Sequence, residues 1–166
     1  MTVFSDTDIL QALQAGTLGI TPFEERNLTP NGYDLSIAEI MVPDVHGTET
    51  RFREGRVVIP GQARFLVSTR EVVRMPKDVC AQLWIRSSYA RRGVIGVFGK
   101  VEAGFEGTLT IGAFNAGAQP LEIPVGDRFC QIVFERLLSP PRALYAERSG
   151  NYQNQRGITL ARDQPR

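Results

Sequence analysis

The chain has 166 residues, of which 42% are hydrophobic and 22% are charged. These proportions are typical of a folded soluble protein of one domain, and they exclude a chain that is disordered throughout. The 19 basic residues nearly balance the 18 acidic ones, so no global field attracts polymeric nucleic acid or an anionic membrane.

Cysteine and histidine are too few for a zinc centre or a disulfide framework. Cys80 and Cys130 lie in apolar, strand-like runs, where buried and reduced thiols are expected. Zinc needs about three or four Cys or His ligands, and the one histidine, His46, lies in a polar run that predicts a loop. No signal peptide and no apolar run of membrane-spanning length is visible, so we expect a cytoplasmic protein.

A short helix is predicted at the start of the chain. Ser5 and Asp8 have the spacing of a capping box. Ile9 and Leu13 follow at helical spacing, and Gly16 is a plausible end.

After this helix the pattern changes to short runs rich in Val, Ile and Phe. Many of these runs alternate apolar and polar residues, and the 16 glycines and 10 prolines separate them. This pattern favours a β-sandwich or β-barrel and excludes a mainly helical fold. The expected strands are residues 33–37, 56–59, 65–68, 79–85, 109–111, 121–123 and 129–134.

We place a boundary after residue 138, between a β domain (1–138) and a C-terminal tail (139–166). Ser139–Pro141 interrupts the last predicted strand, and amide and aromatic side chains follow with few apolar ones. This composition favours a mobile tail. The alternative is a segment that becomes ordered over a ligand.

Two segments carry side chains suited to a nucleotide. Arg86, Ser87 and Ser88 follow the predicted strand 79–85, and Arg91 comes one turn later. Guanidinium and hydroxyl groups match phosphate oxygens, although an N-capped surface helix explains the same residues.

The second segment, Glu102–Gly107, predicts a tight turn with a carboxylate and an aromatic ring. Its glycines permit close approach of a planar ligand, and Phe105 is suited to stack on a sugar or base. Taken alone, it is equally an ordinary hairpin turn.

Taken together and in this order, the motifs resemble the dCTP deaminase and dUTPase superfamily over nearly the whole chain. The matching runs are Pro30–Leu35, Arg86–Ser88, Gly104–Gly107, Phe114–Asn115, Gly126–Ile132 and Asn151–Gln155. The resemblance implies a mostly β, distorted barrel or jelly-roll-like dUTPase fold with a short N-terminal helix and a flexible tail. It also implies a homotrimer with active sites at subunit interfaces, and a deoxynucleoside triphosphate bound with Mg²⁺.

The resemblance further implies roles for single positions. Glu102 stands where the family usually has Asp, near the 3′-hydroxyl and the attacking water, and Asn151 stands where it often has Lys. The expected catalytic residues are Glu102, Arg86 and Ser87. The expected nucleotide-binding set is Arg86, Ser87, Ser88, Arg91, Glu102, Phe105, Thr110, Ile111, Gly112, Tyr145, Asn151 and Gln155. No residue is expected to bind Mg²⁺ directly, because the triphosphate holds most of it.

Gly112 distinguishes two reactions. The deaminases of the superfamily carry at this position a Glu that activates water and moves protons at the cytosine ring. Ile111 and Ala113 are apolar and point to the other face of the strand. Losing a positioned acid–base group typically removes about 10²–10⁴-fold in rate.

We therefore expect hydrolysis of dUTP to dUMP and pyrophosphate, with Gly112 leaving space for a pyrimidine read by backbone groups. The segment 93–102 is also short, as in dUTPase-type members. Two alternatives stay open: dCTP deamination to dUTP, and a non-catalytic nucleotide-binding trimer.

Overall fold

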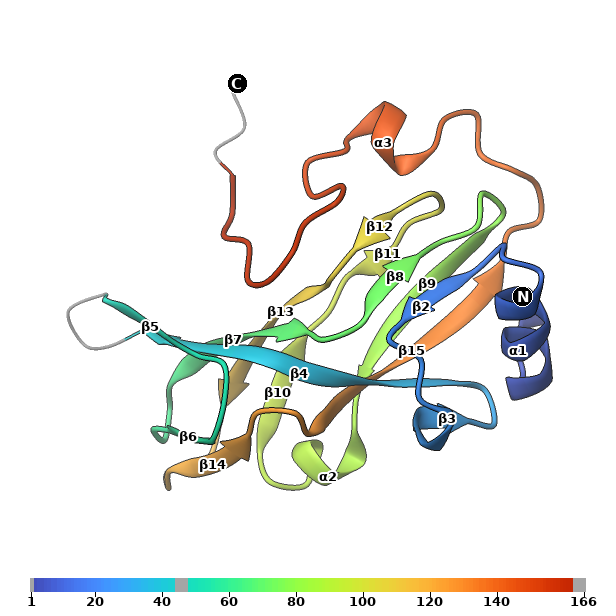
Figure 1. The fold of residues 1–166 in the computed structure, drawn as a ribbon. Coiled ribbons are helices and arrows are strands. Elements are labelled where there is room, and N and C mark those ends of the chain that lie inside the picture. Colours follow the sequence, from blue (N-terminus) through green and yellow to red (C-terminus); the bar gives the residue numbers. More distant parts are fainter. Residues whose placement is uncertain (1, 44–47, 163–166) are drawn as a thin grey trace.

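The computed structural model describes residues 2–43 and 48–162, so the predicted loop around His46 lies outside the described residues. The described chain is a curled, mostly antiparallel β structure with three short helices and a 3-10 turn (Figure 1). The helices are α1 (Asp6–Gln14), α2 (Ser87–Ala90) and α3 (Tyr145–Arg148), and the 3-10 turn is η1 (Glu25–Asn27). The strands are β1 (Thr2–Val3), β2 (Gly19–Thr21), β3 (Leu28–Thr29), β4 (Gly32–Pro43), β5 (Glu49–Phe52), β6 (Arg56–Ile59), β7 (Arg64–Thr69), β8 (Val72–Arg74), β9 (Val79–Ile85), β10 (Val94–Val97), β11 (Lys100–Val101), β12 (Glu106–Gly107), β13 (Thr110–Asn115), β14 (Leu121–Pro124) and β15 (Arg128–Arg136).

The predicted N-terminal helix is confirmed with its cap. Ser5 Oγ accepts the backbone N–H of Asp8 at 3.3 Å, and the Asp8 carboxylate accepts the backbone N–H of Ser5 at 2.9 Å. These two bonds satisfy donors that a helix start leaves without intrahelical partners. The apolar face buries Ile9 completely in the core.

The main sheet has the strand order β10-β13-β7-β4-β15-β9-β11, and β1, β3 and β5 pair at its margins. Two smaller sheets have the orders β12-β8-β2 and β14-β6. The expected strands are confirmed. The strand expected at 109–111 lies further along, in β13, and the run at 33–37 is part of the longer β4. The core is one cluster of buried side chains that includes Ile40, Phe65 and Phe129.

Strand β4 changes its buried face through a bulge. Leu35 and Ile37 belong to the core, but the pairing with β7 shifts register between Ile37 and Glu39, and the next core residue is Ile40. Side chains on a regular strand alternate between its faces, so simple alternation from Ile37 would aim Glu39 into the core. The extra residue instead places Glu39 on the outer face of the sheet.

The two cysteines are free thiols, as expected. Cys130 is fully buried, and this burial raises the pKa of its thiol. Cys80 differs from the expectation in being half-buried, because it lies on the outer face of β9. No helix among residues 2–43 and 48–162 has the length and apolar character that a membrane crossing requires.

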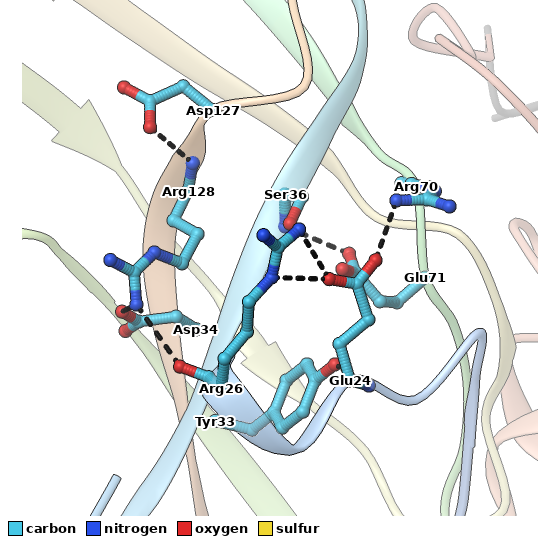
Figure 2. A network of polar contacts seen from close by, with 9 residues as sticks. All are labelled: Glu24, Arg26, Tyr33, Asp34, Ser36, Arg70, Glu71, Asp127 and Arg128. Carbon is cyan, nitrogen blue, oxygen red and sulfur yellow. Dashed lines mark hydrogen bonds and ion pairs between the residues drawn. The ribbon is translucent and has the colours of Figure 1, made fainter. Parts of the chain in front are cut away.

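A polar network joins the turn before β8 to β4 (Figure 2). Glu71 is 1% exposed, and its Oε2 accepts the backbone N–H of Ser36 at 2.9 Å. Beside it, Arg70 pairs with Glu24 at 2.8 Å and Arg26 pairs with the same carboxylate at 2.6 Å. Burial raises the pKa of the Glu71 carboxyl, and the hydrogen bonds from Ser36 oppose that shift.

This shift predicts how the stability of the protein depends on pH. A carboxyl whose pKa is raised by folding contributes stability that is full below its unfolded pKa, about 4.3, and is lost as pH rises through the folded value. Glu71→Gln keeps an oxygen acceptor for Ser36 but carries no charge. We expect the variant to gain unfolding free energy relative to wild type at pH 7, and the gain to shrink toward pH 4.

Urea titrations of both proteins between pH 4 and pH 8 measure this difference. Glu122→Gln, which replaces an exposed carboxylate that pairs with Arg56 on β6, is the control for the loss of a surface charge. A Glu71→Gln difference that stays constant with pH would contradict the assignment.

Candidate active site

The first group of predicted site residues lies where β9 ends and α2 begins. Arg86 precedes α2 without forming a side-chain cap, unlike the N-capped helix considered from the sequence. The side chains of Ser87, Ser88 and Arg91 are exposed around this single turn. Two hydroxyls and the Arg91 guanidinium are therefore exposed beside the partly buried Arg86, an arrangement suited to an anionic ligand.

A shared carboxylate holds Arg86 in place. Arg86 Nε lies 2.9 Å from Asp34 Oδ2, and its Nη1 donates to the carbonyl of Arg128 at 3.2 Å. Arg128 Nη1 approaches the same Asp34 oxygen at 3.6 Å (Figure 2). Burial raises the pKa of Asp34, while the charges of Arg86 and Arg128 pull it down. The carboxylate thus fixes two guanidiniums side by side.

Asp34 and Arg128 are absent from the residue set expected from the sequence. Both lie within runs that carried the resemblance, Pro30–Leu35 and Gly126–Ile132. The sequence signal was therefore present, but the pairing of these side chains with Arg86 depends on the contact of β4, β15 and β9.

The second group lines a cleft of about 370 Å³ between β11, the start of β13 and residues 145–162, which we call the C-terminal segment. From the expected set it contains Glu102, Phe105, Thr110, Tyr145, Asn151 and Gln155. The Glu102 side chain is exposed. Phe105 is only 5% exposed and makes an edge contact with Tyr145, so it forms the floor of the cleft. We name this space the Glu102 cleft.

The C-terminal segment reaches this cleft by backbone hydrogen bonds to the edge of β12. The N–H of Asn154 donates to the carbonyl of Glu106 at 2.7 Å, and the N–H of Thr108 donates to the carbonyl of Gln155 at 3.1 Å. Gln155 Nε2 returns a bond to the carbonyl of Thr108 at 2.7 Å. The tail, whose composition favours mobility, is therefore docked in this structure. Its polar groups form hydrogen bonds with Glu106 and Thr108, which lie far earlier in the chain.

Successive residues of β13 lie on opposite faces of the sheet, so Ile111 and Gly112 have different surroundings. Ile111 is 1% exposed in the core and is not among the residues that line either cleft. Gly112 lies on the outer face, where an added Cβ would meet Val97 Cβ at 3.7 Å and Leu66 Cδ2 at 3.8 Å. These are ordinary contacts, so packing does not demand glycine there. Gly112 lines a second cleft of about 560 Å³ that adjoins the first at Thr110.

One copy of the chain does not bring the two groups together. Val101 of β11 pairs with Ala81 of β9, and Arg86 lies five residues further along that strand. At the rise of a β-strand this is about 17 Å. Figure 1 shows α2 at the opposite end of the sheet from β11, β12 and α3.

Among the described residues, no group of three or more His, Cys, Asp or Glu side chains is placed to hold a metal ion. Mg²⁺ keeps several waters and is commonly bound through substrate phosphates with one or two carboxylates. Asp34 is engaged by Arg86 and Arg128, so the exposed Glu102 is the carboxylate available to an ion carried by a phosphate ligand.

Comparison with known proteins places the chain among nucleotide enzymes. A family model described as dCTP deaminase-like matches residues 3–137. A dCTP deaminase of Pyrococcus horikoshii is 41% identical over 143 residues, covering 86% of this chain and 89% of that protein. A probable deoxyuridine 5′-triphosphate nucleotidohydrolase of Sulfolobus islandicus rod-shaped virus 1 is 32% identical over 161 residues, covering 97% and 99%.

Solved structures confirm the predicted fold. The 2′-deoxycytidine 5′-triphosphate deaminase of Agrobacterium tumefaciens superposes with a TM-score of 0.67 over 81% of this chain at 19% identity. This chain spans 48% of that longer one. The dUTPase of Staphylococcus bacteriophage 80alpha superposes with a TM-score of 0.53 over 77% of this chain and 95% of that chain, at 18% identity. At such identities the likeness concerns the fold alone.

Proposed function

We propose that the chain hydrolyses dUTP to dUMP and pyrophosphate. The premise is that it belongs to the dCTP deaminase-like family and is an enzyme of deoxynucleotide metabolism. The names of its relatives favour dCTP deamination, the alternative ranked second from the sequence, better than this reaction. The residue at position 112 supports hydrolysis.

The observation that carries the proposal is the absence of a carboxylate beside Gly112 among the described residues. Its outer-face neighbours, Val97 and Leu66, are apolar. In the cleft that Gly112 lines, Glu49 is the one carboxylate among the described residues. Glu49 lies on β5, three strands away from β13 and therefore about 14 Å across the sheet. Deamination without zinc requires such a group within hydrogen-bond reach of the ring.

Hydrolysis requires groups that the chain does carry. The oxygen of a water attacks the α-phosphorus, the bond from that phosphorus to the bridging oxygen breaks, and pyrophosphate leaves. In our proposal Glu102 orients this water and accepts its proton, while Arg86, Ser87 and Arg91 bind phosphate oxygens. Tyr145 and Gln155 exclude bulk water from the cleft. Bound Mg²⁺ would neutralise charge on the triphosphate.

A nucleotide that contacts both groups needs two copies of the chain. Arg86 and Glu102 lie at opposite ends of one sheet, so the complete site forms where the α2 end of one copy meets the Glu102 cleft of another. Exposed apolar side chains on neighbouring parts of the surface support association: Trp84 and Ile95 are 57% exposed and Val97 is 70% exposed. With the resemblance, this leads us to propose a homotrimer.

The product formed from each nucleotide tests the proposed reaction. The protein is incubated with Mg²⁺ and dUTP, dCTP or dTTP, and the products are separated by chromatography. We expect dUMP and pyrophosphate from dUTP, and a loss of at least about 10²-fold in rate in Glu102→Gln, because the amide cannot accept the proton. Glu106→Gln, on the same turn, is the matched control.

Formation of dUTP and ammonia from dCTP would show that the chain is a deaminase and would refute the proposed hydrolysis. Saturable binding of all three nucleotides without any product would support the non-catalytic trimer instead.

The second candidate, deamination, is tested by restoring the missing carboxylate. A Cβ at position 112 meets only ordinary contacts, so Gly112→Glu adds its first side-chain atom without a clash. If the absent acid–base group is what separates the two reactions, this variant gains ammonia release from dCTP by about 10²-fold or more. Gly112→Gln, which has the same size without the proton transfer, gains none. Ammonia release by wild type at a rate that Gly112→Glu does not change would refute the argument from position 112.

Mixing two inactive variants tests the shared site. Arg86→Ala and Glu102→Gln each damage one half, so each variant alone is expected to be inactive. After subunits exchange from an equal mixture, about a quarter of the interfacial sites combine two intact halves, and turnover returns to about that fraction of wild type. Activity of the mixture equal to the sum of the separate variants would show that one chain supplies both halves.

A further inference from the structure

Glu39 is a buried carboxylate that the proposed reaction does not use. The bulge in β4 aims it to the outer face of the main sheet, yet its side chain is only 4% exposed. The cover comes from the C-terminal segment, where Ile158 is 5% exposed without belonging to the core cluster. A charge buried in the middle of a sheet requires partners.

Those partners bind the backbone of the tail. The N–H of Ile158 donates to Glu39 Oε2 at 3.0 Å, and Arg51 Nη1 donates to the carbonyl of Ile158 at 3.2 Å. Arg51 and Arg53 form ion pairs with the same carboxylate at 3.9 and 3.3 Å. Both polar groups of the Ile158 backbone are therefore satisfied by one carboxylate–guanidinium pair from β4 and β5.

Gly157 makes this approach possible. Its φ is +67°, in the left-handed region that favours glycine. An added Cβ would lie 3.2 Å from Glu39 Oε2, closer than side chains ordinarily pack. Gly157, which has no side chain, therefore lets the tail backbone pass close to the Glu39 carboxylate.

The anchored segment continues directly into the Glu102 cleft. Thr159 N–H donates to Thr110 Oγ1 at 3.0 Å, and Thr110 lines that cleft. Gln155, which also lines it, lies three residues before Ile158. Fixing Ile158 on the sheet therefore limits how far Gln155 moves from its place beside β12.

We propose that Glu39 is a positioning residue that anchors the C-terminal segment on the outer face of the sheet and thereby holds Gln155 over the Glu102 cleft. The anchor itself is a feature of the fold, whereas its effect on turnover rests on the proposed function. When the segment lifts, water and the two arginines take over the carboxylate, so the anchor opens without leaving an unpaired buried charge.

Limited trypsin digestion reports the anchor without any substrate. The bond after Arg156 lies between Gln155 and Ile158, so its cleavage requires the segment to leave the sheet. In Glu39→Ala we expect this cleavage to accelerate about tenfold to a hundredfold, the effect of losing a hydrogen bond to a charged group. Cleavage after Arg142, an exposed site before the segment, is the internal reference and stays unchanged.

Two further variants separate the anchor from general destabilisation. Glu135→Ala removes a comparably buried carboxylate of β15 that accepts a hydrogen bond from Gln82 of β9, and it leaves cleavage after Arg156 as in wild type. Gly157→Ala disturbs the tail side of the contact without touching the sheet, and it accelerates cleavage as Glu39→Ala does. Equal cleavage rates in Glu39→Ala and wild type would overturn the proposal.

Kinetics then tests the positioning role. In Glu39→Ala the KM for dUTP rises about tenfold, and Glu39→Gln, which keeps an oxygen acceptor for Ile158, restores part of the loss. If wild type turns over no nucleotide, the proposed function fails while the digestion still decides the anchor. If digestion shows release but KM is unchanged, the tail is anchored by Glu39 without being positioned for substrate, and the proposal is overturned in that part.

Discussion

The architecture depends on a change of face within one strand. β4 lies in the middle of the main sheet, and its bulge lets the same strand supply Leu35, Ile37 and Ile40 to the core while two buried carboxylates lie on its other face. Asp34 precedes the bulge and holds the arginines at the α2 end. Glu39 follows it and holds the C-terminal segment. A strand without the extra residue would direct one of these charges into apolar packing.

Local signals were sufficient for the parts of the fold whose causes are local. The capping pair Ser5 and Asp8 lies within one turn, and the strands at 56–59 and 79–85 have an apolar alternation that matches their burial. The site was harder to predict, because Arg86 acquires its setting only when β4, β15 and β9 pair. Docking of the tail was hidden for the same reason: Gln155 and Thr108 are separated by 47 residues, and the bonds involve backbone groups that leave no mark on composition.

Family membership and the chemistry at position 112 bear on different questions. Relatives at 32–41% identity establish which nucleotide enzymes the chain belongs with. A fold of this kind hosts more than one reaction, so the reaction is decided by side chains placed at the reacting atoms. In our proposal the distinguishing feature is the missing side chain of Gly112, whose outer-face neighbours Val97 and Leu66 are apolar. The proposed phosphate-binding groups are suited to either reaction and therefore do not discriminate between them.

The bonds between the tail and β12 have a consequence for how the protein behaves in a crowded solution. β12 is the outermost strand of its small sheet, and unpaired backbone groups at such an edge are a template on which other chains can add as further strands. Asn154 and Gln155 occupy these groups from within the same molecule. The segment that covers the cleft thus also seals a sheet edge against self-association, so loss of the tail would reduce colloidal stability as well as access to the cleft.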